Sequence, residues 1–346
     1  IYRLQGKEYV EVESLAPGDI GAIAKVDEIE FDCVLHDSHD EDHIHLVPLE
    51  FPRPMAGLAV ETRKKGDEQR LFDILGKLAV EDPTFIVERH PTSNETVIRG
   101  LGEIHLKSKL EKMAAQYKLE VDTRPPTIPY RETITAAAEG IHRHKKQSGG
   151  AGQFGEVHLR IEPKGRGEGI EFVDAVKGGV IPGVFMAAVE KGVRQGLEGG
   201  VVAGYAVDDL KVTVFDGKTH PVDGKEVAFV TAGRKAVIEA VRAARPIVLE
   251  PIVSVEIIVP EASIGDLTGD LSSRRGHITG TDGRGHGMSA ITGEVPLAEI
   301  SDYQSRLKSL TGGQGSYTIE FARYAAVPPN VQQQMAGKFQ LREDDE

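Results

Sequence analysis

The sequence has almost no cysteine and no long apolar run, and each absence excludes a class of protein. Its single cysteine, Cys33, excludes an internal disulfide framework and is typical of a reducing compartment. No apolar stretch approaches the roughly 20 residues needed to cross a bilayer. The chain begins at Ile1 without a methionine or a charged-then-apolar leader. We therefore expect a piece of a longer cytoplasmic protein with no membrane partner.

Positive charge is also scarce, since 41 Lys and Arg face 54 Asp and Glu and the formal net charge is −13. Such a balance at first argues against a nucleic-acid partner. The acidic excess lies at the ends, because residues 1–50 hold 13 acids against 3 bases and residues 338–346 hold 4 against 2. The stretch 51–337 carries a net charge of only −1. The total charge therefore excludes no partner of the central part.

The 346 residues, 40% of them hydrophobic, are enough for several domains. The order strand–helix–strand–strand–helix–strand is predicted twice, over 51–127 and over 250–327, and is the ferredoxin-like motif. Residues 128–249 have a different order and predict an α+β arm domain. Its expected strands and helices are 131–134, 154–162, 170–175 and 206–214, and 183–198 and 228–244. Residues 328–346 predict a short helix and an acidic tail.

Residues 1–50 alternate polar and apolar side chains, as strands do, at 9–12, 20–26 and 31–35. We interpret them as the end of a β-barrel whose beginning is missing. The predicted fold class is therefore α+β and multi-domain, with two ferredoxin-like domains flanking an α+β arm and a partial β-barrel before them.

A polar segment rich in histidine and aspartate contains His36, His39, His43 and His45, close to Cys33. Imidazole and carboxylate groups at such spacing can hold zinc, but structural zinc sites usually show paired cysteines. A solvated acidic loop is the favoured interpretation. We expect no metal site; if the segment did bind a metal ion, these four histidines would be the candidate ligands.

Motifs for nucleotide chemistry are absent or out of context. Gly217-Lys218-Thr219 resembles the end of a phosphate-binding loop, but Val212 stands where the first glycine is required. The string GAGQFG at 150–155 matches a dinucleotide motif, yet a strand rather than a helix is predicted to follow it. We therefore expect no catalytic residue and no bound cofactor in this chain.

The stretch 143–155 contains three firm positive charges, followed by four glycines and two glutamines. Glycines let a backbone approach a bulky partner, Lys and Arg neutralise phosphates, and Gln can contact bases or riboses. A hairpin tip with solvated charges is the alternative. Arg274 and Arg275 follow a predicted helix, where they either complement its C-terminus or face RNA phosphates.

Several strings together resemble bacterial elongation factor G. AVEDPTF at 79–85 and GLGEIHL at 100–106 are similar to its domain III, and YRETI at 130–134 with QSGGAGQFG at 147–155 to its domain IV. GDL at 269–271, RRG at 274–276, VPL at 295–297 and the residues 324–328 resemble domain V. The first 50 residues are similar to the end of domain II. These blocks cover essentially the whole chain in the right order.

The resemblance implies a monomeric part of a translational GTPase whose GTP and magnesium bind in a missing N-terminal domain. Its partners would be the ribosome, with its rRNA and proteins, and the tRNA–mRNA complex during translocation. The implied tip residues of domain IV are Lys145, Lys146, Gln147, Ser148, Gly149, Gly150 and Gln153. The string 216–223 is similar to the second tip loop and places His220 beside the first, and Arg274 and Arg275 would face large-subunit rRNA.

Two departures keep alternatives open. The family loop commonly has a basic residue where this chain has Ala151, and the segments 142–146 and 36–45 differ from the housekeeping factor. A paralogue acting in ribosome recycling is one alternative. A stand-alone RNA- or protein-binding module is another.

Overall fold

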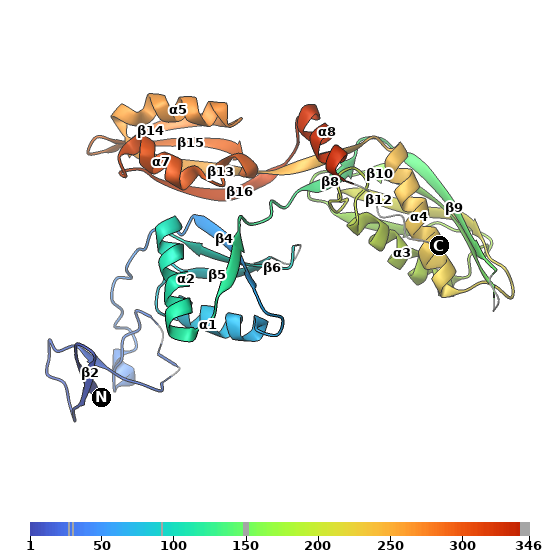
Figure 1. Ribbon diagram of the computed structural model, residues 1–346. Coiled ribbons are helices and arrows are strands. Elements are labelled where there is room, and N and C mark those ends of the chain that lie inside the picture. Colours follow the sequence, from blue (N-terminus) through green and yellow to red (C-terminus); the bar gives the residue numbers. More distant parts are fainter. Residues whose placement is uncertain (27, 30, 91–92, 148–151, 340–346) are drawn as a thin grey trace.

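The structure, a computed structural model, describes residues 1–26, 28–29, 31–90, 93–147 and 152–339 (Figure 1). These residues form four separate sheets with helices packed on three of them. The fold is α+β and multi-domain, as predicted. None of the helices in the described ranges is long and apolar enough to cross a membrane.

The N-terminal residues form a small sheet of order β2-β1-β3, from β1 (Tyr2–Gln5), β2 (Glu8–Glu11) and β3 (Gly21–Ala22). A one-turn helix, η1 (His39–Glu41), follows. The described part of 1–50 contains no closed barrel and no fully buried side chain. The strand predicted at 31–35 is absent, and that prediction was wrong. Without a core to pack against, the alternation of its side chains does not impose an extended backbone.

The predicted ferredoxin-like fold over 51–127 is present. Its sheet has the order β5-β6-β4-β7 with all neighbours antiparallel, and α1 and α2 supply the rest of the core. Leu71, Ile74, Leu75 and Leu78 lie on one face of α1 because they repeat at helical spacing, and all four are buried. The elements are β4 (Ala56–Thr62), α1 (Glu68–Val80), β5 (Ile86–His90), β6 (Glu95–Gly100), α2 (Glu103–Tyr117) and β7 (Val121–Arg124).

The second ferredoxin-like domain has the equivalent order β14-β15-β13-β16. Its elements are β13 (Pro246–Pro260), η3 (Glu261–Ser263), α5 (Ile264–Ser273), β14 (His277–Gly285), β15 (Met288–Pro296), α6 (Leu297–Ile300), α7 (Tyr303–Thr311) and β16 (Ser316–Ala326). The second helical segment of this order is divided, because a turn at 301–302 separates α6 from α7. That turn lets Tyr303 enter the core, where its side chain is fully buried.

The arm between them is a four-stranded sheet of order β11-β12-β10-β9, with α3 and α4 packed on one face. Its elements are β8 (Arg131–Ile134), β9 (Ala138–Lys146), β10 (Gln153–Pro163), β11 (Ile170–Asp174), η2 (Gly183–Phe185), α3 (Met186–Glu198), β12 (Leu210–Lys218) and α4 (Glu226–Ala243). Strand β9 was not predicted. A Cβ on Gly140 would lie 2.0 Å from the Ala236 carbonyl oxygen of α4, so this strand packs on the helix through a bare backbone rather than an apolar side chain.

The arm joins the second ferredoxin-like domain through a shared strand (Figure 1). The first residues of β13 pair with β8, and the same strand continues into the sheet with β15 and β16. Helix α8 (Pro329–Lys338) packs back on it, where Gln332 accepts from the Val248 amide at 3.0 Å. The Tyr324 hydroxyl donates to the Pro129 carbonyl at 2.9 Å, and Arg131 lies over the Tyr324 ring.

Candidate nucleic-acid interface

The basic stretch forms the end of a β-hairpin in the arm. Strands β9 and β10 are antiparallel, with Gln153 opposite Lys146 and Phe154 opposite Lys145. Lys145, Lys146 and Gln147 are exposed, and among the described residues no carboxylate pairs with either lysine. The three remaining candidates of this loop, Ser148, Gly149 and Gly150, lie outside the described residues.

The second loop, residues 219–225, lies against this hairpin. The Phe154 amide donates to the Asp223 carbonyl oxygen at 2.8 Å, and the rings of Phe154 and His220 lie 6.2 Å apart. A Cβ on Gly152 would lie 2.6 Å from the Asp223 carboxylate, so this close approach requires glycine. The structure therefore brings His220 and Gln153 to the same end of the arm as the two lysines.

The imidazole of His220 also holds the shape of its own loop. Its Nδ1 accepts from the backbone amides of Val222 at 3.3 Å and Asp223 at 3.1 Å. An Nδ1 that accepts carries no proton, so the ring proton is on Nε2. The side chain is 51% exposed, and the Asp223 carboxylate lies 3.4 Å from Nδ1.

A buried carboxylate ties together the strands that lead to both loops. Glu156 of β10 is 5% exposed and pairs with Arg143 of β9, with His158 Nε2 at 2.9 Å and with Lys218 of β12 at 4.0 Å. Burial raises the pKa of Glu156, but hydrogen bonds from Arg143 and His158 outweigh it and the net shift is downward. Glu156 was not among the predicted site residues, because the strand that carries Arg143 opposite it was not predicted either.

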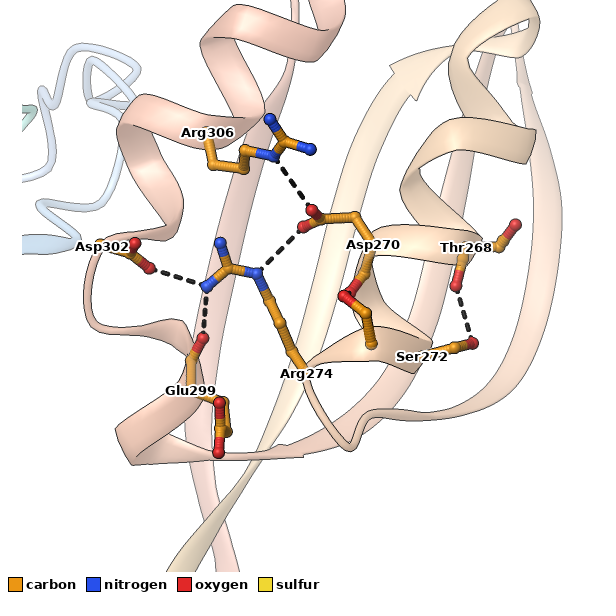
Figure 2. Close-up of polar contacts among 8 residues, drawn as sticks. Thr268, Asp270, Ser272, Arg274, Glu299, Asp302 and Arg306 are labelled. Carbon is orange, nitrogen blue, oxygen red and sulfur yellow. Dashed lines mark hydrogen bonds and ion pairs between the residues drawn. The ribbon is translucent and has the colours of Figure 1, made fainter.

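Arg274 is enclosed by acceptors of its own domain (Figure 2). Its guanidinium donates to Asp270 at 3.0 Å, to Asp302 at 2.7 Å and to the Glu299 carbonyl at 2.6 Å, and the side chain is 18% exposed. Arg306 donates to the other oxygen of Asp270 at 3.0 Å. Burial lowers the pKa of Arg274, but the interactions with Asp302 and Asp270 raise it by more, so the net shift of the pKa is upward.

Arg275 forms a two-pronged ion pair with Glu250, at 2.6 and 2.9 Å, and also contacts Glu299. The hydrogen bonds to Glu250 raise the pKa of Arg275 well above its usual range. The Glu250 side chain is 4% exposed, so the arginine neutralises a buried charge. Both arginines thus connect α5 to neighbouring elements, and the geometry supports the structural alternative for them over contact with RNA phosphate.

The histidine-rich segment brings two of its histidines to the same carboxylate. His36 Nε2 lies 3.5 Å and His39 Nδ1 3.6 Å from the Asp42 carboxylate. His36 and His45 line a hollow of about 450 Å³ with Cys33, whereas His43 does not. In the described part of the chain, no group of three or more His, Cys, Asp or Glu side chains is arranged to hold a metal ion.

Three family models match consecutive parts of the chain. They are described as "Elongation Factor G, domain III", residues 51–125, "Elongation factor G, domain IV", residues 126–245, and "Elongation factor G C-terminus", residues 247–335. A curated relative from Thermotoga maritima, described as "Elongation factor G-like protein", is 43% identical over 329 residues, covering 95% of this chain and 48% of the relative. A crystal structure from Thermus thermophilus matches with a TM-score of 0.79 at 36% identity, covering 97% of this chain and 50% of the other. The chain thus spans about half the length of both.

Proposed function

Because this chain belongs to the elongation factor G family, we propose that it is the ribosome-engaging part of a translational GTPase. In this proposal the factor promotes movement of the tRNA–mRNA complex, and the end of the arm acts in the decoding region. Three consecutive family matches and a relative covering 95% of the chain support the assignment.

The observation that carries the proposal is the meeting of two loops at the end of the arm. Lys145 and Lys146, at the end of β9, have no carboxylate partners among the described residues, and His220 of the second loop lies beside this end. Ammonium groups bind RNA phosphates, while Gln147 and Gln153 add amide donors and acceptors for bases and riboses. A tip of this kind acts by position and charge, since movement is biased when it binds one state of the RNA better than the other.

GTP chemistry belongs, in this proposal, to a part of the factor outside the chain. The matched domains are the non-catalytic ones of the family. GTP and magnesium would bind elsewhere in the parent protein, and this chain would not hydrolyse GTP alone. We further propose a monomeric, cytoplasmic factor.

A paralogue that acts in ribosome recycling is the second candidate. The Thermotoga maritima relative is described as "Elongation factor G-like protein", and this description favours a paralogue without naming the step in which it acts. Both candidates use the same tip, so they differ in the step that the tip biases rather than in the surface that binds.

The test replaces both tip lysines, Lys145→Ala with Lys146→Ala, in the whole factor that carries this chain. Translocation and recycling rates are measured on ribosomes, and the affected step identifies the candidate. The matched control is Lys64→Ala with Lys65→Ala, an exposed lysine pair in the loop between β4 and α1. Equal rates for the tip variant and the control in both assays would refute the proposal.

A further inference from the structure

The sheet of the arm has one face that no helix covers, among the residues that the structure describes. Helices α3 and α4 pack on the side that carries Val157, Leu159 and Ile161 of β10. Because side chains alternate along a strand, Glu156, His158 and Arg160 lie on the opposite side. Their neighbours on β9 are Arg143, Ile141 and Glu139. We call this the open face.

A β-bulge places an aromatic ring at the centre of the open face. The register between β10 and β12 shifts after His158, so that His158 is opposite Asp216 while Leu159 is opposite Val214. Phe215 is the extra residue, and its partly exposed ring contacts His158 edge-on at 6.2 Å. The Arg160 guanidinium lies over the same ring at 5.8 Å. Ile141, 49% exposed, lies opposite His158 on β9.

Cations form the outer layer around this ring. The side chains of Arg143, Arg160 and Lys218 are 57%, 53% and 65% exposed. The Glu156 carboxylate beneath Arg143 and Lys218 is only 5% exposed, so these two cations outnumber it and reach further into solvent. Arg160 pairs with Glu139, which is 47% exposed. Asp216, Glu162 and Glu171 are further exposed acids of the face, and Glu162 and Glu171 lie beside Lys211 of β12, at the end away from the tip. The surface is positive toward the tip, where Lys145 continues the same side of β9.

We propose that the open face is a second RNA-binding surface of the arm, separate from its tip. An unpaired base stacks on Phe215 beside His158 and Arg160, and the phosphates on either side of it bind Arg143 and Lys218. Rings and guanidinium planes on an uncovered sheet stack bases of any sequence, and positive side chains around them hold the backbone. The inference rests on the proposed function only in taking RNA as the partner of the arm.

The half of the open face toward the tip, where Arg143, Lys145 and Lys218 lie, has an excess of cations that favours RNA over a protein partner. A protein interface of this size has an apolar centre with charged groups at the rim. Here the largest apolar groups are one partly exposed ring and Ile141, and the Arg160 guanidinium lies directly over the ring rather than at the rim of a larger apolar centre. Phosphates can bind these cations while a base covers the ring.

The first test measures binding of the full chain to a fluorescein-labelled single-stranded RNA of ~12 nucleotides. Phe215→Leu keeps an apolar side chain of similar bulk but removes the stacking plane, so we expect affinity to fall about tenfold. Phe321→Leu is the matched control, because Phe321 is also an exposed ring on a strand, β16 of the other domain, and is 61% exposed. Phe215→Tyr should retain wild-type affinity.

The second test uses the absence of tryptophan from the sequence. Phe215→Trp introduces a single indole on the open face, and stacking of a base on it quenches its fluorescence as the RNA is added. Phe321→Trp should show no quenching. This reading does not depend on a loss of affinity, so it stands even if Phe215→Leu lowers stability.

The outcomes separate this inference from the proposed function. If Phe215→Leu and the control bind RNA equally and Phe215→Trp is not quenched, the open face is not an RNA surface. If, in addition, the tip variant still lowers the translocation or recycling rate on ribosomes, the proposed function is unaffected by that result. Weaker ribosome binding by Phe215→Leu with unchanged RNA binding would assign the face to a protein and overturn the inference. If Phe215→Leu loses RNA binding while the tip variant shows normal rates on ribosomes, the inference about the open face stands and the proposed role of the tip is refuted.

Discussion

The side-chain amide of Gln304 donates a hydrogen bond to the carbonyl oxygen of Leu101 across the two ferredoxin-like domains, at 3.1 Å. The amide of the same Leu101 donates to His105 Nδ1 at 3.1 Å, and His105 Nε2 lies 3.0 Å from Asp82. A short loop between β6 and α2 is thus held from inside its own domain and from the other domain. The contact provides a direct route by which the position of one domain affects the other.

Replacing Gln304 should loosen this contact without unfolding either domain. We expect Gln304→Leu to cost about 1 kcal/mol, the usual net value of one hydrogen bond, and to raise amide exchange at residues 100–102. Gln314→Leu is the control, since Gln314 is exposed in the turn after α7. Hydrogen exchange followed by mass spectrometry measures both, and equal protection in the two variants would exclude the route.

Glu132 should be essential for the arm because its fully buried carboxylate accepts four backbone hydrogen bonds. The donors are the amides of Val201, Val202, Ala203 and Tyr205, at 2.7, 3.0, 2.7 and 3.2 Å. Glu132→Gln turns a donor group toward these donors, so we expect a loss of about 3 kcal/mol in a urea unfolding experiment. Glu139→Gln, an exposed carboxylate of β9, should change stability by less than about 1 kcal/mol.

The stability of the first ferredoxin-like domain should fall in acid through Glu95. Burial raises the pKa of this carboxyl, but hydrogen bonds from Thr127 and Ser93 and the ion pair with Arg124 lower it to about 2. The folded pKa lies below the ordinary value of 4.5, so the stabilisation is present above pH 4.5 and is lost as the pH falls toward 2.

The measurement is the urea midpoint of this domain between pH 7 and pH 2.5. Glu95→Gln should be less stable than the parent at pH 7, by at most about 3 kcal/mol, and should show a smaller fall below pH 4.5. Glu88→Gln, which removes a more exposed carboxylate of β5, should leave the acid dependence unchanged. A parallel pH profile for Glu95→Gln and the parent would contradict the assignment.

Arg275 should act on stability rather than on RNA affinity. Arg275→Met leaves the Glu250 carboxylate buried without its partner, and we expect a cost of about 3 kcal/mol. Adding Glu250→Gln removes the unpaired charge and should restore part of the loss. If the double variant is stable but binds ribosomes much more weakly than the parent, Arg275 contacts the partner after all.

The sequence predicted elements well where side chains repeat with a clear period. The four buried residues of α1 are an example, because their spacing alone places them on one face of a helix. Strand β9 was missed because Gly140 meets the helix through its backbone and leaves no apolar alternation to detect. The strand expected at 31–35 had the alternation but no core.

The candidate site was predicted in part for similar reasons. Lys145 and Lys146 are neighbours in sequence, so their gathering at the tip could be anticipated. Asp270 lies only four residues before Arg274, but the other partners of Arg274 and Arg275 lie 24 to 28 residues away, and no local pattern predicts Asp302 or Glu250. Phe215 was missed because the strand predicted over 206–214 ends one residue before it, whereas β12 extends to Lys218.

Because β13 runs without a break from the arm into the second ferredoxin-like domain, it couples the orientation of the arm to that domain. Its 15 residues extend over about 50 Å; Pro246–Leu249 pair with β8, and Leu249–Pro260 pair with β16 or β15. Rotation of the arm about this junction must twist the paired strands β8 and β13 or break the pairing of the four residues that join them. A force applied at the tip of the arm is therefore transmitted through β13 to the second ferredoxin-like domain. A large change in the angle between these two domains would require movement elsewhere in the chain.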